Sequence, residues 1–168
     1  MAERRIVTYG DPVLREVCEP VEEINQEIKD LVFSMTDTLK KANGLGLAGP
    51  QVGVLKRVFI VDLSAVDINA SLKVFINPEI LETNGEVELE EGCLSFPGMY
   101  QKIKRASTVK VRATNLDGKV FEMEATGIAA RAVLHEYDHL EGVLFIDHFS
   151  PMAKALVRGR LRKIAKVS

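Results

Sequence analysis

The sequence predicts a single α+β domain over residues 1–168, with mostly antiparallel sheets around a central helix that carries a His-Glu-x-x-His motif. Three observations support this fold class. One helical pattern precedes several strand-like segments and two helical patterns follow them, an order typical of α+β folds. The segment 107–126 has the alternation and the turn of an antiparallel hairpin. The 168 residues suffice for one well-packed domain and are too few for two ordinary ones.

After an irregular N-terminal stretch, the first predicted element is a helix in the N-terminal half of the chain. Its apolar residues recur at three- and four-residue spacing, which gives one apolar face: Ile28, Leu31, Val32, Met35 and Leu39. We expect this helix to begin near Asn25, a good N-cap, and to end at Asn43-Gly44, a good C-terminal stop.

The middle of the chain alternates strand-like segments with turns. A glycine-rich loop is expected at 44–53. Runs of β-branched and aromatic residues then predict strands at 57–63 and 73–81. Three pairs interrupt or turn the chain: Asn77-Pro78 within the second strand, Asn84-Gly85 after it, and Asp117-Gly118 in the hairpin.

Two helices are predicted in the last third of the chain. The first starts at Gly127, is rich in Ala and Leu, and ends at Gly142. The second occupies 150–168 and begins at Ser150-Pro151, a capping residue followed by a proline at the first helical position. Every charged residue after Phe149 is basic, so this C-terminal helix is expected to be amphipathic with a basic solvated face.

Composition excludes several classes of function. Hydrophobic residues make up 46% of the chain and charged residues 27%, a globular balance. The net charge of −2 gives no overall electrostatic case for binding DNA or a membrane surface. No apolar run approaches the ~20 residues that span a bilayer, and no signal peptide is expected. Two cysteines are too few for a disulfide scaffold, so we predict a cytoplasmic protein.

The segment 134–142 carries the residues with the clearest chemistry. His135 and His139 are four positions apart on a predicted helix, so both rings lie on one face, with β-carbons about 5–6 Å apart. Both can offer a ring nitrogen to one metal ion at ~2.0–2.1 Å. Glu136 lies near the same edge and can reach a water at that ion without ligating it. The alternative is a pair of surface histidines that flank a glutamate by chance.

A third ligand is missing from this motif. One protease class extends it with a glycine and a further histidine; Gly142 fits, but the last position is Phe145, which cannot ligate. Another class takes a glutamate from a later helix, and no glutamate follows Glu141. Asp147 and His148 remain, in no established spacing.

Cys93 is the better candidate for the third ligand. It lies in a short turn after Gly92 and an acidic alternating strand, and a thiolate with two imidazoles leaves a coordination position open for water. A lone cysteine is, however, most often a small buried apolar residue, and that alternative stays open on spacing alone. Cys18 has no partner signal and is predicted to be structural.

Three segments, in this order, resemble the motifs of peptide deformylases: GLGLAGPQVG at 44–53, EGCLS at 91–95 and HEYDH at 135–139. The similarity extends from GDPVLR near the N-terminus through RATNLDG to HLEGVLFID, which is nearly the whole chain. Any one motif is shared by other proteins, but the three together are highly specific. The resemblance implies an enzyme that removes the formyl group from the N-terminal formyl-methionine of newly made polypeptides and releases formate.

The resemblance also implies a role for each site residue. Cys93, His135 and His139 would bind one divalent metal ion per chain, and Glu136 would act as general base and then as general acid. The side-chain amide of Gln51 and the backbone N–H of Leu94 would stabilise the tetrahedral oxyanion. Glu91 and its partner Arg105 would orient the ligands. The pocket for the methionine side chain and the peptide would be lined by Leu45, Gly46, Leu89, Ile128, Arg131 and Ala132.

Asp138 could hold a neighbouring group or simply cap the polar face of its helix, and we expect the second. Two positions depart from the family pattern: Leu134 stands where a glutamine is common, and Gly49 replaces the second of two alanines. The implied metal is Fe²⁺, with Zn²⁺, Ni²⁺ and Co²⁺ also compatible with one thiolate and two imidazoles. The implied partners are formylmethionyl nascent peptides, and we hypothesise weak contact of the basic C-terminal helix with the ribosome.

Two other functions are compatible with the motifs. A metallopeptidase would use His135, His139 and a downstream ligand, so it would keep its metal without Cys93 and would cleave internal peptide bonds. A non-catalytic metal-binding or redox-sensing protein would not need Glu136.

Overall fold

Seven strands and three α-helices are present in the described part of the chain, residues 3–64 and 66–167, in a computed structural model. The helices are α1 (Gln26–Ala42), α2 (Gly127–Leu140) and α3 (Pro151–Val167). The strands are β1 (Gly46–Ala48), β2 (Val58–Val61), β3 (Lys73–Asn84), β4 (Val87–Gly92), β5 (Tyr100–Arg105), β6 (Thr108–Thr114) and β7 (Val120–Thr126). Short 3₁₀ helices occupy Pro12–Arg15, Gly49–Val52 and Phe145–His148.

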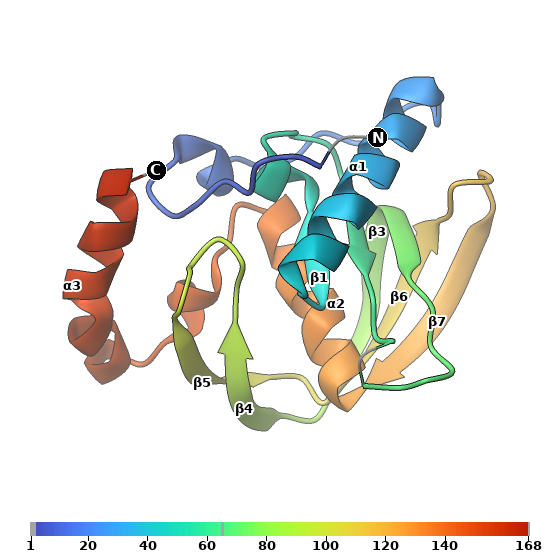
Figure 1. Cartoon of the computed structure of the whole chain (residues 1–168). Coiled ribbons are helices and arrows are strands. Elements are labelled where there is room, and N and C mark those ends of the chain that lie inside the picture. Colours follow the sequence, from blue (N-terminus) through green and yellow to red (C-terminus); the bar gives the residue numbers. More distant parts are fainter. Residues whose placement is uncertain (1–2, 65, 168) are drawn as a thin grey trace.

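The strands form two antiparallel sheets. The larger sheet has the order β1-β2-β3-β6-β7, and the smaller one pairs β4 with β5. Helix α2 lies at the centre of the molecule, packed on the larger sheet, with the β4–β5 hairpin and α3 on its other side (Figure 1). This arrangement confirms the predicted α+β class. The predicted domain limits at residues 1 and 168 lie outside the described residues.

Three clusters of buried side chains hold these layers together. One joins the larger sheet to α2 and includes Phe59, Phe75 and Val133. A second packs the apolar face of α1 on the sheet, and a third lies beneath α3 and β5. Full burial of one large apolar side chain contributes roughly 1.5–3 kcal/mol to the stability of the fold. The buried apolar side chains of α2 therefore hold this helix firmly on the larger sheet.

The helix ends follow the predicted capping chemistry. The Asn25 side chain accepts a hydrogen bond from the N–H of Ile28 at 3.1 Å, and Asn43 adopts φ 56° at the C-cap of α1. The Ser150 hydroxyl accepts from the N–H of Ala153 at 3.1 Å and caps α3. None of the helices in the described residues is both long and apolar enough to cross a membrane.

One expectation about the strands is wrong, one is confirmed, and one strand was not predicted. The glycine-rich segment is not only a loop, because it contains β1 and a 3₁₀ helix. The predicted interruption at Asn77-Pro78 is present as a register shift, beyond which β3 continues, with Asn77 at φ 50° and its side chain bonded to both backbone polar groups of Val21. Strand β5 was not predicted, and β4 after the Asn84-Gly85 turn pairs with β5.

Candidate metal centre and active site

Cys93, His135 and His139 converge at one point between α2 and the end of β4. Their ligand atoms all lie within 4.8 Å of one another, the one such group of three found among the described residues. The Cys93 Sγ lies 3.5 Å from His139 Nε2. One turn of α2 separates the two histidines, and the turn after β4 presents the cysteine, where the N–H of Phe96 donates to the Cys93 carbonyl at 2.9 Å. A soft thiolate with two imidazoles fits a divalent transition metal.

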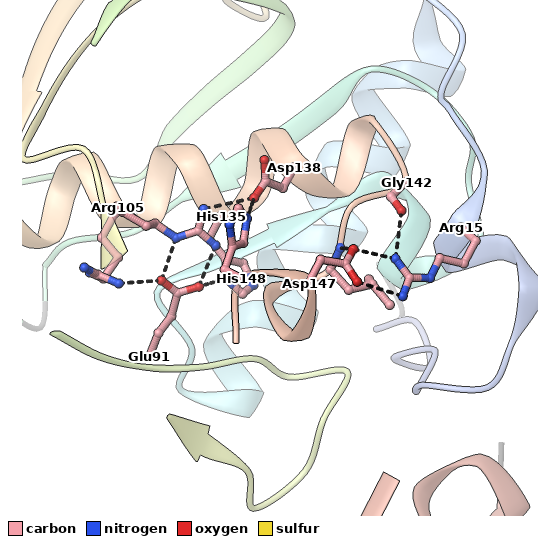
Figure 2. A network of polar contacts seen from close by, with 10 residues as sticks. Arg15, Glu91, Arg105, His135, Asp138, Gly142, Asp147 and His148 are labelled. Carbon is pink, nitrogen blue, oxygen red and sulfur yellow. Dashed lines mark hydrogen bonds and ion pairs between the residues drawn. The ribbon is translucent and has the colours of Figure 1, made fainter. Parts of the chain in front are cut away.

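A buried carboxylate orients the first of these histidines. The Glu91 Oε2 is hydrogen-bonded to His135 Nδ1, which leaves the other ring nitrogen for a metal. The same carboxylate accepts from Arg105 Nε at 2.7 Å and Nη2 at 2.8 Å, and from Arg131 Nη1 at 2.9 Å (Figure 2). Burial alone would raise the pKa of Glu91, but the hydrogen bonds from Arg105 and His135 hold it well below its usual range.

This cluster extends toward the surface through Asp138. The Asp138 Oδ2 accepts from Arg105 Nη1 at 2.9 Å and lies 2.8 Å from His148 Nε2 (Figure 2). The prediction that Asp138 only occupies the polar face of its helix is therefore wrong. Asp138, Arg105 and Glu91 form a continuous chain of ion pairs from a half-exposed histidine to a metal-site histidine.

Glu136 lies beside the three candidate ligands, and one of its carboxylate oxygens is unpaired in the described part of the chain. Its side chain is buried, and its Oε1 has no hydrogen-bond partner among the described residues. Burial raises the pKa of Glu136 to about 7. The carboxylate fits against β1 because position 46 is a glycine: a β-carbon there would lie 2.7 Å from Glu136 Oε2. Burial lowers the pKa of His139, which favours the neutral ring that a metal binds.

Gln51 enters the site from the 3₁₀ helix that follows β1. Its side chain is 1% exposed, and its Oε1 accepts from the N–H of Ala48 at 3.0 Å. Its Nε2 lies 3.2 Å from the Ser95 hydroxyl and 3.7 Å from Cys93 Sγ. The amide therefore points its N–H groups toward the proposed metal ligands.

These residues border a cavity of about 590 Å³. Every predicted site residue except His139 and Arg105 lines it, including all six that were predicted to contact the substrate. Arg131 was expected to line the cavity wall with its stem. It does line the cavity, and its guanidinium also donates to Glu91 and to the Val87 carbonyl. Sequence reasoning missed Ser95 and the lining residues that directly follow it, which are Phe96, Pro97, Gly98, Met99 and Tyr100.

Both departures from the family pattern have a structural reason. A β-carbon at Gly49 would lie 2.6 Å from the carbonyl oxygen of Val54 and 2.9 Å from that of Lys56, so an alanine would force this turn to move. Leu134 packs against the core cluster between α2 and the larger sheet, where it is partly buried. Neither residue touches the three proposed ligands.

A His-Glu-x-x-His helix, a third ligand from a turn and a buried carboxylate beside them define a site of the metallohydrolase class. The sequence model of the polypeptide deformylase family matches residues 3–155. Peptide deformylase 1 of Clostridium perfringens (strain 13 / Type A) is 53% identical over 148 residues, which cover 88% of this chain and 99% of that protein. The peptide deformylase of Thermodesulfovibrio yellowstonii is 48% identical over 96% of this chain and 98% of its own.

Solved structures agree with these sequence matches. A peptide deformylase from Legionella pneumophila superposes with a TM-score of 0.91 at 39% identity, covering 99% of this chain and 97% of that one. The peptide deformylase from Thermus thermophilus gives 0.90 at 36% identity, covering 97% and 98%. The chain belongs to the polypeptide deformylase family, whose members are metalloenzymes of protein biosynthesis. It is a hydrolase that acts on the formyl amide of N-formylmethionine peptides.

Proposed function

We propose that this enzyme uses one divalent metal ion, held by Cys93, His135 and His139, and that Glu136 moves the protons of the reaction. The observation that carries this proposal is the convergence of three possible ligand atoms within 4.8 Å beside a buried carboxylate oxygen that has no partner among the residues the structure describes. Such a carboxylate is costly to leave unpaired unless water or substrate occupies the space next to it.

A divalent ion in such a site supplies Lewis-acid chemistry, which makes water nucleophilic near neutral pH. Fe²⁺ is our first choice for the native ion because the sequence resembles a family that typically uses it. Zn²⁺, Ni²⁺ and Co²⁺ suit the same donor set. Cys93 is half-buried, and a thiolate at the cavity wall makes the site sensitive to oxidation.

Glu136 is the proposed proton carrier. With a pKa raised to about 7, its carboxylate is in part ionised at neutral pH and can accept a proton from the attacking water. The water oxygen bonds to the formyl carbon, and the C–N bond to the peptide breaks. Glu136 then returns its proton to the departing amine, so that formate and a free N-terminus are released.

Two donors are proposed to stabilise the charge on the formyl oxygen. One is the side-chain Nε2 of Gln51, and the other is the backbone N–H of Leu94 in the turn after Cys93. Both residues line the cavity. Loss of one such donor typically lowers kcat by about 10²–10³.

The remaining cavity is proposed to hold the methionine side chain and the start of the peptide. Its 590 Å³ is within the usual range of roughly 300–1,000 Å³ for ligand pockets. The apolar contacts would come from Leu45, Leu89, Ile128 and Ala132. Gly46 would leave its strand backbone open to an extended peptide. Arg131 would contribute only its aliphatic stem, because its guanidinium is engaged by Glu91.

Helix α3 is proposed to contact the ribosome, where nascent chains emerge in the cytoplasm. Its buried residues Ala153 and Val157 face the core, and six basic residues are exposed: Lys154, Arg158, Arg160, Arg162, Lys163 and Lys166. Cosedimentation with ribosomes at two salt concentrations tests this against a variant in which the exposed arginines become glutamine. We expect the wild type to pellet more at low salt, and equal pelleting of both proteins would contradict the proposal.

The mechanism is tested with Glu136→Ala beside the wild type. The variant should fold and keep its metal, measured by elemental analysis, while formate release from a formyl-Met peptide falls by about 10²–10⁴. Wild-type protein loaded anaerobically with Fe²⁺ that releases no formate would overturn the proposal. Cys93→Ser should lose the metal, whereas a metallopeptidase with a downstream ligand would keep it.

A further inference from the structure

The amide of Gln51 is held at both of its ends by buried groups. The Ala48 N–H donates to Oε1 at 3.0 Å, so a flip of the amide would place two donors against each other. At the other end Nε2 donates to the Ser95 hydroxyl at 3.2 Å. Gln51 is 1% exposed and Ser95 is fully buried, so bulk water cannot replace either bond.

The backbones of Gln51 and Ser95 are both bonded to one short segment near the N-terminus. The Val7 N–H donates to the Gln51 carbonyl at 2.7 Å, and the Tyr9 N–H donates to the Ser95 carbonyl at 2.9 Å. Because Val7 and Tyr9 are only two residues apart, these bonds hold the two backbones close together. The backbone carbonyl of Ser95, and not its hydroxyl, makes this contact with the N-terminal segment.

The Ser95 hydroxyl has a different task. Its partner among the described residues is Gln51 Nε2. A side-chain amide has two N–H donors. One is engaged by Ser95, and the other points to Cys93 Sγ in a long contact of 3.7 Å. Gln51 and Cys93 both line the cavity where the formyl oxygen is proposed to develop its charge.

We propose that Ser95 is a positioning residue that acts through Gln51, holding one N–H of its amide so that the other meets the oxyanion. The inference rests on the proposed role of Gln51 as an oxyanion donor. Preorganised donors are effective because they need no reorientation when charge develops. Without the hydroxyl the amide keeps its anchor at Ala48 but can tilt, and one buried N–H is left unpaired.

A double-mutant cycle tests the coupling. Ser95→Ala, Gln51→Ala and the double variant are loaded with the same metal to the same content, and formate release from a formyl-Met peptide is measured. We expect Ser95→Ala to lower kcat by about tenfold and to leave KM within about twofold, because the donor acts in the transition state. In the Gln51→Ala background, Ser95→Ala should have no further effect. Ser34→Ala, at another buried serine outside the cavity lining, is the matched control and should retain full activity.

A second readout follows the amide itself. In ¹⁵N-labelled, Zn²⁺-loaded protein, Ser95→Ala should shift one of the two side-chain N–H resonances of Gln51, whereas Ser34→Ala should leave both in place. An equal loss of kcat with and without Gln51, or unchanged Gln51 resonances, would overturn the inference and leave the proposed mechanism intact. Full kcat in Gln51→Ala alone would instead remove Gln51 from the mechanism, and the role of Ser95 with it.

Discussion

Two arginine–carboxylate clusters in Figure 2 share their chemistry and differ in burial. In the inner cluster, Glu91 binds Arg105 and Arg131, and all three side chains are 4–7% exposed. In the outer cluster, Arg15 makes a two-point contact with Asp147, with side chains 46% and 36% exposed. The inner cluster ends on His135, one of the proposed metal ligands, whereas the outer one joins two short 3₁₀ helices.

The difference in burial gives the same arginine–carboxylate interaction a different effect in each cluster. A buried ion pair carries a large desolvation penalty, so it contributes little net stability but becomes very sensitive to the loss of one partner. An exposed pair is screened by water and contributes at most about 1 kcal/mol. The inner cluster is therefore suited to hold a ligand in one orientation, and the outer cluster to a small adjustment of the fold.

Glu91→Ala should have the largest effect, because it leaves the buried guanidinium of Arg131 without a carboxylate and that of Arg105 with Asp138 alone. We expect the free energy of unfolding to fall by about 3–5 kcal/mol, measured by urea denaturation. Metal affinity, measured by competition with a chelator, should fall by about 10–100-fold because His135 loses its orienting partner. Asp147→Ala in the outer cluster is the control and should leave metal affinity unchanged. A stability loss for Glu91→Ala below about 1 kcal/mol would show that the inner cluster is not as tightly coupled as its contacts indicate.

Replacing arginine by lysine in each cluster compares their geometry at constant charge. Arg105 donates to Glu91 through two nitrogens and to Asp138 through a third. A single ammonium cannot reproduce this fork, so Arg105→Lys should cost about 1.5–3 kcal/mol. Arg15→Lys should cost less than about 0.5 kcal/mol, because the outer pair is exposed. Equal losses in the free energy of unfolding for Arg105→Lys and Arg15→Lys, measured by thermal or urea denaturation, would contradict the distinction between the two clusters.

Asp138→Asn acts at the half-buried link between the inner cluster and His148. The amide keeps the shape but removes the charge that faces Arg105, while every contact of Glu91 remains. We expect a loss of about 1 kcal/mol in the free energy of unfolding, and a smaller drop in metal affinity than for Glu91→Ala. If Asp138→Asn equals Glu91→Ala in metal affinity, the orienting group is the whole chain of ion pairs and not Glu91 alone.

Local features of the fold were predictable from the sequence, and long-range pairings were not. The caps at Asn25 and Ser150 depend on residues three positions away, so short-range patterns identify them. The bulge at Asn77 depends on its bonds to Val21, which lies 56 residues earlier. Three of the six residues of strand β5 are charged, and Tyr100 and Ile103 are too few to mark a strand, so its pairing with β4 supplies what its own sequence does not.

The same division applies to the site. His135 and His139 were predicted from helical spacing, and Cys93 from its place in a turn and then from the resemblance to a family. The engagement of Arg131 by Glu91 and of Asp138 by Arg105 spans 40 and 33 residues, and no periodic pattern carries that information. Ser95 also escaped notice, because a serine inside a motif gives no sign that its hydroxyl meets an amide from another segment.

Asp147→Asn should have the smallest effect, with a clear dependence on pH. Burial would raise the pKa of Asp147, but hydrogen bonds from Arg15 and from the N–H of Leu144 lower it. Because the pKa is lower in the folded state, the charge stabilises the fold above the unfolded pKa of about 3.9, and this contribution is lost as the pH falls through the folded value.

The free energy of unfolding of the wild type should therefore exceed that of Asp147→Asn by about 0.5 kcal/mol at pH 7, and the difference should shrink as the pH falls below about 3.9. Urea unfolding of both proteins from neutral to acid pH, at low and high salt, measures it. A difference that stays constant as the pH falls would contradict a contribution from the Asp147 charge. It would make the ion pair with Arg15 incidental to stability, because neutral Asp and Asn both offer the N–H of Leu144 a carbonyl oxygen.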